Sequence, residues 1–167
     1  VNTWTSGVVP NTAQDITISH DVTVNTNTND LGDLTIDNGA TLTVGAYTLE
    51  ASGTVDVNGT LSLGASAVAN IDGAYDATGG NTTFTGSGTL KLGSTVTSLG
   101  TFAKATDCTV EYDGVDQTVA QLIQSDSYFN ADFSTAYHYD GFSSYFTVKN
   151  LLLRAKNNLI NNLEPLD

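Results

Sequence analysis

The stretch NGTLSLG at residues 58–64 decides the fold, because close copies of it occur twice more in the chain. NGATLTVG occupies residues 38–45, and GSGTLKLG occupies residues 86–93. Each copy places a glycine shortly before Thr-Leu, then one variable residue and a second Leu or Val. A phrase that returns in this way is typical of a fold built from stacked structural repeats, whereas a single catalytic site does not require it.

The residues around these copies, 15–64, alternate apolar and polar side chains, which is the pattern of short half-buried strands. Expected strands begin at positions 22, 42 and 61, at nearly constant intervals. We therefore predict an all-β fold, a right-handed parallel β-helix or solenoid with coils of about 20 residues. Leu49 and Ala51 are candidates for a third strand in each coil. Each copy of the phrase is expected at the same place on successive coils, with Leu42, Leu61 and Leu63 pointing inward.

The spacing changes after residue 64. The interval from Leu61 to Leu90, which belong to the second and third copies, is much longer than one coil of about 20 residues. Two interpretations stay open: one coil is irregular, or a loop bulges out around YDATGGN at residues 75–81. The strand pattern returns at Val110 and Tyr112.

The end of the chain differs in composition from the repeats. We divide the chain into a solenoid at 1–121 and a C-terminal cap or assembly segment at 122–167, since solenoid ends need covering. A helical stripe from Val148 to Leu163 is favoured over a last coil with Asn at its corners. The predicted assembly residues are aromatic or basic: Tyr128, Phe129, Phe133, Tyr137, Lys149, Arg154 and Lys156.

The net charge of the chain excludes some classes of binding partner. The chain has 167 residues with 18 acidic and 5 basic side chains, a net charge of -13. Nucleic acid and anionic membrane surfaces are not expected as partners, because both require clustered Lys and Arg. No apolar run is long enough to span a membrane, so membrane insertion is not expected. The chain has no Met and begins at Val1, which favours a processed protein or a piece of a larger one.

The first 120 residues resemble the parallel β-helix repeat regions of large secreted bacterial surface proteins, such as adhesins. In that family a Trp and a Pro open the first coil, and Trp4, Pro10, Asp15 and Ile16 match this opening. Similar coils occur in phage tail fibres and virion surface proteins. The resemblance implies a β-solenoid and says less about function, because the matching residues form corners and core. The matching phrases are TWTSGVVPNTAQDITISHDVTV (3–24), DLTIDNGATLTV (33–44), GTVDVNGTLSLG (53–64) and TVEYDGVDQTVAQ (109–121).

Catalytic and cofactor-binding residues are not predicted. Cys108, the only cysteine, stands at an alternating position and is expected to be a buried small apolar residue. Asp107 and Glu111 would share an outward strand face with Thr109 between them. Such a group could bind calcium or sugar, or it could keep an exposed strand edge charged against aggregation. Calcium is the single candidate cofactor, and its candidate ligands are Asp107, Glu111, Asp113 and Asp116.

Two further features invite a binding role. Flat rows of threonine can bind ice or crystalline polysaccharide, and Thr41/Thr43 and Thr83/Thr85 are the clearest pairs, although the sequence does not repeat them coil after coil. Trp4 is expected to cap the first coil, and a sugar-binding platform is the alternative.

Three hypotheses for function follow. The leading one is a non-enzymatic extracellular structural or adhesive module of a surface protein or filament, whose partners are copies of itself or other surface proteins. The second is a phage or virion fibre or a capsid decoration protein. The third is a carbohydrate-binding or carbohydrate-active β-helix. The expected location is extracellular or at the cell surface, or on a virion under the second hypothesis.

Overall fold

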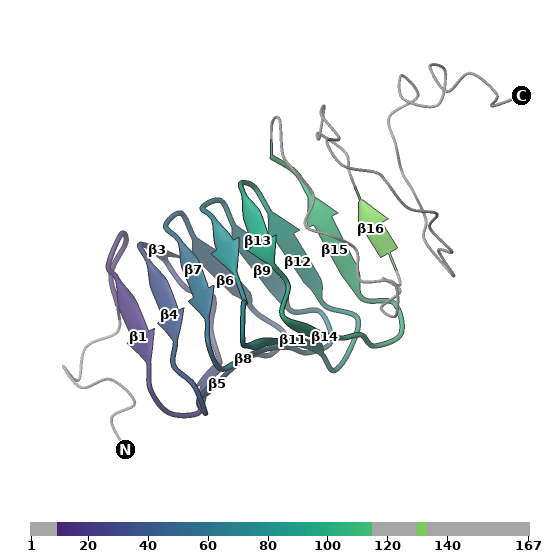
Figure 1. The fold of residues 1–167 in the computed structure, drawn as a ribbon, viewed down its shortest axis with the longest axis horizontal. Helices are drawn as coiled ribbons and strands as arrows, with labels where there is room; N and C mark the ends of the chain where they lie inside the picture. Colours follow the sequence, from purple (N-terminus) through teal and green to yellow (C-terminus); the bar gives the residue numbers. More distant parts are fainter. Residues whose placement is uncertain (1–9, 115–129, 133–167) are drawn as a thin grey trace, which may run out of the picture.

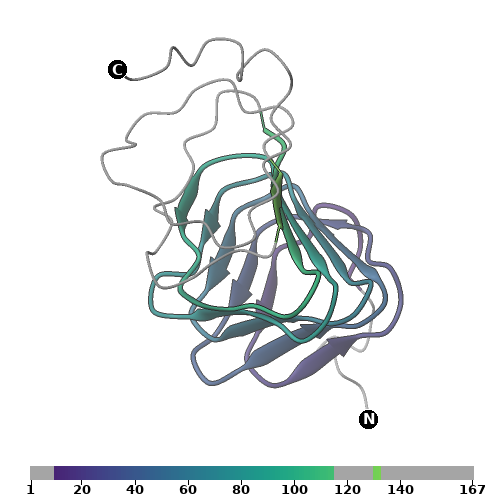
Figure 2. The same cartoon turned by 90° about the vertical axis from the view of Figure 1, so that its right-hand side faces the viewer.

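The structure, a computed structural model, describes residues 10–114 and the strand at residues 130–132. In these residues all strand pairs are parallel, and the strands form three sheets that enclose one core (Figure 1). The view in Figure 2 shows the chain winding around this core coil after coil. This part of the chain contains no helix. The predicted all-β parallel solenoid is therefore confirmed.

Five coils are described, and each contributes one strand to each sheet. The first two coils contain β1 (Ile16–Ile18), β2 (Val22–Val24) and β3 (Asp30–Leu31), then β4 (Leu34–Ile36), β5 (Thr41–Val44) and β6 (Thr48–Ala51). The third and fourth contain β7 (Val55–Val57), β8 (Thr60–Leu63) and β9 (Val68–Ile71), then β10 (Tyr75–Asp76), β11 (Asn81–Phe84) and β12 (Thr89–Leu92). The fifth contains β13 (Val96–Ser98), β14 (Thr101–Ala103) and β15 (Thr109–Tyr112).

We name the three sheets A, B and C in the order in which the chain enters them. Sheet A is β1-β4-β7-β10-β13, sheet B is β2-β5-β8-β11-β14, and sheet C is β3-β6-β9-β12-β15-β16. The strand β16 (Asn130–Asp132) pairs with β15 and so extends sheet C beyond the fifth coil. Each coil thus has three strands, and β6 confirms the third strand anticipated at Leu49 and Ala51.

The register confirms the predicted length of the coil. In sheet B, Leu42 pairs with Leu61, Leu61 with Thr82, and Thr82 with Phe102. Each step of this series advances the chain by about 20 residues, as the repeat of a solenoid requires. Because side chains alternate between the two faces of a strand, this register stacks inward residues on inward residues through all five coils.

The core is a narrow apolar column between the three sheets. Leu42 is 2% exposed, and Leu61 and Leu63 are each 0% exposed, which confirms their predicted inward direction. Leu34 from sheet A and Leu49 from sheet C are each 1% exposed. Burial of these side chains is the main stabilising term, because each strand is too short to persist alone.

Thr82 is the buried polar residue of this core, at 0% exposure. Its Oγ1 lies 2.7 Å from the hydroxyl oxygen of Tyr75, which is also 0% exposed. The pair satisfies the Thr82 hydroxyl away from water, where an unmade hydrogen bond costs about 1–3 kcal/mol. Burial raises the pKa of Tyr75 strongly, so its phenol stays neutral.

The third copy of the repeated phrase does not lie above the other two, contrary to the prediction from sequence. The first two copies form β5 and β8 in sheet B, but the third forms β12 in sheet C. The residue above Leu61 is Thr82, and Leu90 belongs to the next strand along the chain. The long interval from Leu61 to Leu90 is therefore one full coil, which ends at Thr82, and the passage from sheet B to sheet C.

No loop bulges around residues 75–81 in this coil. Residues Asn81–Phe84 pair one for one with Thr60–Leu63 of the coil before. The fourth coil is longer by one residue at the corner between β10 and β11, because residues 77–80 separate Asp76 from Asn81 where residues 57–59 separate Asp56 from Thr60. The register shift between β10 and β13 arises in the fifth coil, where Thr97 is the extra residue. Of the two open interpretations, a mildly irregular coil holds and the bulging loop is wrong.

The first coil is rich in Asn, Thr and Asp, and several of these side chains accept hydrogen bonds from backbone amides of the second coil. Asp21 Oδ1 accepts a hydrogen bond from the Thr41 amide at 2.9 Å, and Asn27 Oδ1 accepts one from the Thr48 amide at 3.0 Å. Thr28 Oγ1 accepts one from the amide of Glu50 at 2.9 Å. These side chains satisfy backbone groups of the second coil where β2 and β3 supply too few carbonyls.

Several predictions concern residues outside the described ranges. They are the cap at 122–167 apart from β16, its helical stripe, its aromatic and basic assembly residues, Asp116 and the packing of Trp4. All of them stay predictions, as does the division of the chain at residue 121.

Candidate functional site

The outward side chains of the three sheets form the surface that a partner can contact. Sheets A and C both carry charge within their strands, with Asp56 and Asp76 on sheet A. The five strands of sheet B contain no charged residue. Charge appears beyond the ends of these strands, for example at Asp21 before β2 and Lys104 after β14. Sheet B is thus a neutral face on a strongly acidic chain.

The neutral face consists of two columns of small polar side chains, which the register aligns from coil to coil. All members except Ala103 carry a hydroxyl or amide, and neighbouring members come from successive coils. The first column is Thr41, Thr60, Asn81 and Thr101, and the second is Thr23, Thr43, Ser62, Thr83 and Ala103.

Threonine pairs do not recur coil after coil, as expected, but small polar pairs of mixed type do. Thr41/Thr43 lies beside Thr60/Ser62, which lies beside Asn81/Thr83. Neighbours in a column are about 4.8 Å apart and the two columns are about 6.6 Å apart, as the spacing of strands and residues requires. The repeated phrase Gly-Thr-Leu does not reveal this periodic array, because the third copy of the phrase lies in sheet C and not in sheet B.

The outward face of sheet C carries a column of mostly charged residues. One residue from each of β3, β6, β9, β12 and β15 stands in the same register position, and acids occupy both ends. The column is Asp30, Glu50, Asn70, Lys91 and Glu111.

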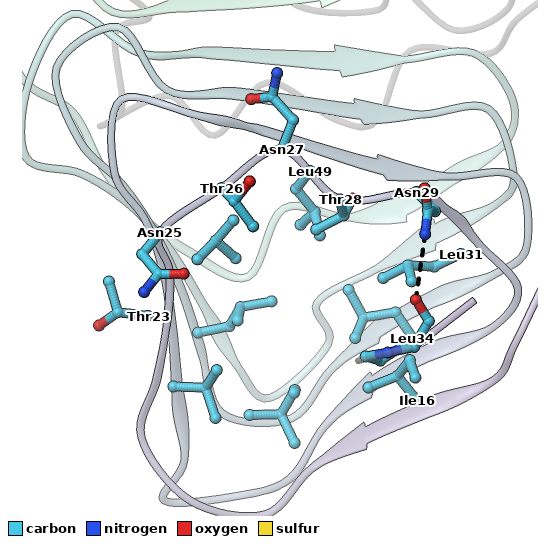
Figure 3. Close-up of a pocket in the computed structure, with 15 residues that line it drawn as sticks. Ile16, Thr23, Asn25, Thr26, Asn27, Thr28, Asn29, Leu31, Leu34 and Leu49 are labelled. Atoms are coloured by element: carbon cyan, nitrogen blue, oxygen red, sulfur yellow. Dashed lines mark hydrogen bonds between the residues drawn. The ribbon is translucent and has the colours of Figure 1, made fainter. Parts of the chain in front are cut away.

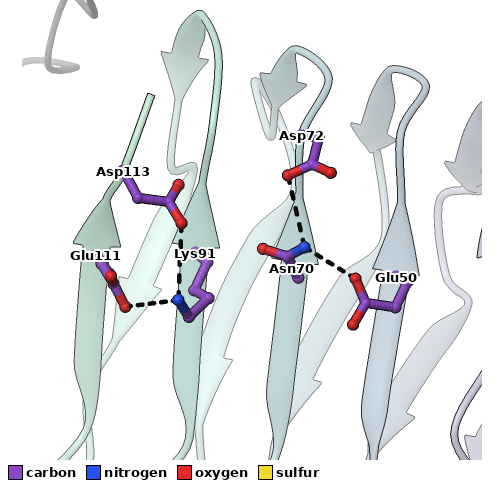
Figure 4. A network of polar contacts seen from close by, with 6 residues as sticks. All are labelled: Glu50, Asn70, Asp72, Lys91, Glu111 and Asp113. Carbon is purple, nitrogen blue, oxygen red and sulfur yellow. Dashed lines mark hydrogen bonds and ion pairs between the residues drawn. The ribbon is translucent and has the colours of Figure 1, made fainter. Parts of the chain in front are cut away.

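Lys91 links the carboxylates of the last described coil (Figure 4). Its Nζ lies 3.1 Å from Glu111 Oε2 and 3.7 Å from Asp113 Oδ2. The hydrogen bond that Lys91 donates to Glu111 raises the pKa of the Lys91 ammonium, and the opposing desolvation is smaller. The three side chains are between one fifth and one third exposed, so solvent screens these attractions.

Asn70 has a similar role one coil earlier. Its Nδ2 donates to Glu50 Oε2 at 2.8 Å and approaches Asp72 Oδ1 at 3.5 Å. Figure 4 shows Asn70 and Lys91 on adjacent strands, each in contact with two carboxylates. Asn70 and Lys91 therefore separate Glu50 from Glu111 in the column, which reduces repulsion between these coils, whereas Asp30 and Glu50 are direct neighbours.

Of the predicted calcium ligands, the described structure brings Glu111 and Asp113 together, at Lys91, and not Asp107. Asp107 lies in the turn before β15, with φ of 63°, and not on the strand face that was expected. Glu111 and Asp113 face Lys91, a cation, and Asp116 lies outside the described residues. Within the described ranges no group of three or more His, Cys, Asp or Glu residues could hold a metal ion. Calcium binding stays a prediction without a site.

Cys108 is 1% exposed, in agreement with its predicted role as a buried apolar residue. Its position just before β15 places it inside the fifth coil.

We predict a small, salt-dependent effect when Lys91 is replaced by Met. The free energy of unfolding should fall by about 0.5–1 kcal/mol at low salt, since partly exposed ion pairs contribute little. The loss should shrink at 1 M NaCl, where the Debye length is about 3 Å. Urea unfolding at both salt concentrations measures it. Lys91→Arg should retain most of the stability, and equal stability of the Met variant and the wild type at low salt would contradict the prediction.

The same variant should show a defined pH dependence. The pKa of Lys91 is raised in the folded state from its ordinary value of 10.5. The contribution of Lys91 is therefore fully present below about pH 10.5, the value in unfolded chains, and is lost as the pH rises through the folded pKa. The difference in stability between wild type and Lys91→Met should stay constant from pH 7 to 10 and decline above.

A comparison with models of protein families gives one family for this chain. The match covers residues 35–165, from β4 to near the end of the chain, and the family is described as type IX secretion system membrane protein PorP/SprF. The chain belongs to the PorP/SprF family. No curated protein and no solved structure matched the chain in the corresponding comparisons.

Membership in the PorP/SprF family agrees only in part with the resemblance to adhesin-like surface proteins. The β-solenoid that the resemblance implied is confirmed, but the matching family is not one of adhesin or phage fibre repeats. The family description refers to a secretion system, which agrees with a role related to the cell surface and gives no support to a virion. Within the described residues, no helix has the length and hydropathy needed to cross a membrane.

Proposed function

We propose that this chain is a non-enzymatic structural or adhesive module located at the cell surface, where a type IX secretion system operates. The observation that carries the proposal is the continuous stacking of five coils, in which every strand pairing is parallel. Its family supports the surface-related location. Its partners are copies of itself or other surface proteins, and nucleic acid does not fit its charge.

The proposed mechanism is mechanical. Backbone hydrogen bonds between coils run along the solenoid axis, for example from the Val68 amide to the Tyr47 carbonyl at 3.0 Å and from the Thr89 amide to the Ala67 carbonyl at 2.8 Å. Stretching or bending the rod breaks many such bonds together, since each coil rests only on its neighbours. A stiff module of this kind holds another part of the surface assembly at a fixed distance.

The location is tested by labelling intact cells of the source organism with an antibody against this chain. Labelling of intact cells is expected, and it should disappear when type IX secretion is inactivated. A control antibody against a cytoplasmic protein should label only permeabilised cells. Labelling that requires permeabilisation in normal cells would overturn the proposed location.

The neutral face of sheet B supports a second candidate function, the binding of an uncharged polysaccharide. Its two columns present hydroxyl and amide groups at regular spacing and contain no charged residue, so a neutral glycan that covers them desolvates little charge; Asp21, beside Thr41, lies at their edge. The other two faces carry carboxylates, which favour water over a neutral crystalline surface. In this function the solenoid lies flat on the glycan along its axis.

Depletion from solution by insoluble cellulose, chitin or β-glucan tests this second function. Binding to at least one of them is expected, with no release of soluble sugar and no dependence on calcium. Thr43→Lys, in the middle of the neutral face, should reduce binding at least tenfold. Thr35→Lys places the same charge on sheet A, beside Asp56, and should bind like wild type. Equal binding by the two variants, or none by wild type, would exclude the neutral face as a glycan site.

A further inference from the structure

The N-terminal end of the solenoid has an open apolar mouth (Figure 3). A cavity of about 180 Å³ lies inside the first coil, and its apolar lining includes Pro10, Ile16, Val22, Leu31 and Leu49. Residues 25–29 form the polar rim, with Asn25, Asn27 and Asn29 labelled in Figure 3. A smaller engineered cavity of about 150 Å³ with apolar walls binds benzene, so this mouth has room for an aromatic ring.

The register shows that this mouth is incompletely covered. Val22 and Val24 hold the same inward positions as Leu42 and Val44 in the second coil. Leu42 and Val44 are 2% and 0% exposed, whereas both valines of the first coil are only partly buried. Among the described residues, nothing covers the first coil as each later coil is covered on this side, and solenoid ends require such a cover.

We propose that residues 1–9 of this chain fill the mouth, with the indole of Trp4 inside the cavity. The segment enters the described structure at Pro10, which is buried, lines the cavity and accepts a hydrogen bond at its carbonyl from Asn29 Nδ2 at 3.4 Å. The chain from Trp4 to Pro10 can reach up to about 20 Å, while a strand as short as β2 spans about 10 Å. The chain between Trp4 and Pro10 is therefore long enough for the indole to reach the cavity.

The chemistry of the segment also fits. Residues 1–9 read VNTWTSGVV, with no charged side chain, and they hold the only Trp of the protein. An uncharged segment with one large aromatic ring suits a cavity whose walls are aliphatic. The aromatic residues beyond 121 stand among lysines, an arginine and acids, so their entry into the mouth would bring charge to the apolar rim.

Because Trp4 is the only Trp, its fluorescence reports directly on this proposal. In the whole folded chain we expect emission shifted to shorter wavelength than in urea-unfolded chain, with acrylamide quenching reduced several-fold. Val22→Thr makes the mouth more polar and should shift the emission to longer wavelength and increase quenching. Val68→Thr is the matched control, since Val68 lies on the outward face of β9, and it should leave both signals unchanged.

A second variant keeps the test decisive if Val22→Thr folds poorly by circular dichroism. Trp4→Ser should leave the strand signal intact and increase the binding of the apolar dye ANS several-fold, because the cavity is then empty. Trp4 emission and quenching like those of unfolded chain, or no gain in ANS binding on Trp4→Ser, would overturn the proposal. Protection of Trp4 that is lost on dilution would also overturn it and assign the mouth to a second copy.

Discussion

Leu61→Asp is expected to prevent folding. Leu61 is 0% exposed at the centre of sheet B, where it stacks between Leu42 and Thr82 of the neighbouring coils. The change removes a buried aliphatic side chain, at about 2–5 kcal/mol, and places a carboxylate in the core without a partner. The combined cost is of the order of the total stability of a domain, about 5–15 kcal/mol.

The measurement is far-ultraviolet circular dichroism with urea unfolding. Leu61→Asp should lack a cooperative transition, and Ser62→Asp is the matched control. Ser62 is the next residue of the same strand and points outward, so its replacement should change the free energy of unfolding by about 1 kcal/mol or less. If both variants unfold like wild type, the inward column of the solenoid does not exist as described.

Gly73→Ala should produce the next largest loss of stability, about 3 kcal/mol, because a side chain there overpacks the contact between two coils. Gly73 lies at the corner between β9 and β10, directly above Gly53 of the previous coil, and a Cβ there would overlap the Gly53 carbonyl oxygen. Backbone cannot move aside as a flexible side chain can. The coils must therefore separate at this corner, which strains the adjacent hydrogen bond from the Asp72 amide to the Ala51 carbonyl at 2.9 Å.

Gly45→Ala provides the control for this prediction. A Cβ on Gly45 would lie 3.6 Å from the Val24 carbonyl oxygen and 3.8 Å from Tyr47 Cδ2, which are ordinary contacts. This variant should be within about 0.5 kcal/mol of wild type or slightly more stable, because Ala restricts the unfolded chain more than Gly does. Thermal unfolding should separate the two variants by about 6–12 °C, at about 2–4 °C per kcal/mol for a chain of this length. Similar melting temperatures would show that the corner has space for a side chain.

The glycine prediction also explains why DVNG and NIDG, at residues 56–59 and 70–73, look like fragments of calcium loops. A Cβ on Gly59 would overlap the Ala40 carbonyl oxygen, so both fragments end in a glycine over which coils stack closely. The hydrogen bonds from Asn to Asp inside them, such as Asn58 Nδ2 to Asp56 Oδ2 at 3.1 Å, are local. Close packing of corners accounts for these residues without an ion.

Local alternation and periodic turns were enough to predict the fold. Inward positions such as Leu42 and Leu61 are specified by a pattern of period two, and the coil length follows from their spacing. Both features reflect short-range physics, since each strand needs one apolar face and each corner needs residues that tolerate tight turns. They therefore remain visible in the amino-acid sequence.

The arrangement of outward side chains on the surface could not be predicted from the sequence in the same way. The third copy of the phrase resembles the first two, yet it forms β12 in sheet C. The sheet to which a strand belongs is decided by the strands of neighbouring coils with which it pairs, here β9. That register places Thr43 beside Ser62 and Lys91 beside Glu111, although a whole coil of the chain separates the members of each pair. The neutral and charged faces arise from these long-range pairings.

The sequence by itself thus determined the class of fold, the length of the coil and which side chains form the core. Only the tertiary structure decided which outward residues are neighbours, that sheet B is uncharged, and that the first coil ends in an apolar mouth. The physical reason is that burial depends on the alternation within one strand, whereas a binding surface depends on how successive coils stack. A slip of a single residue in each coil would preserve the composition of the chain and move every column on its surface.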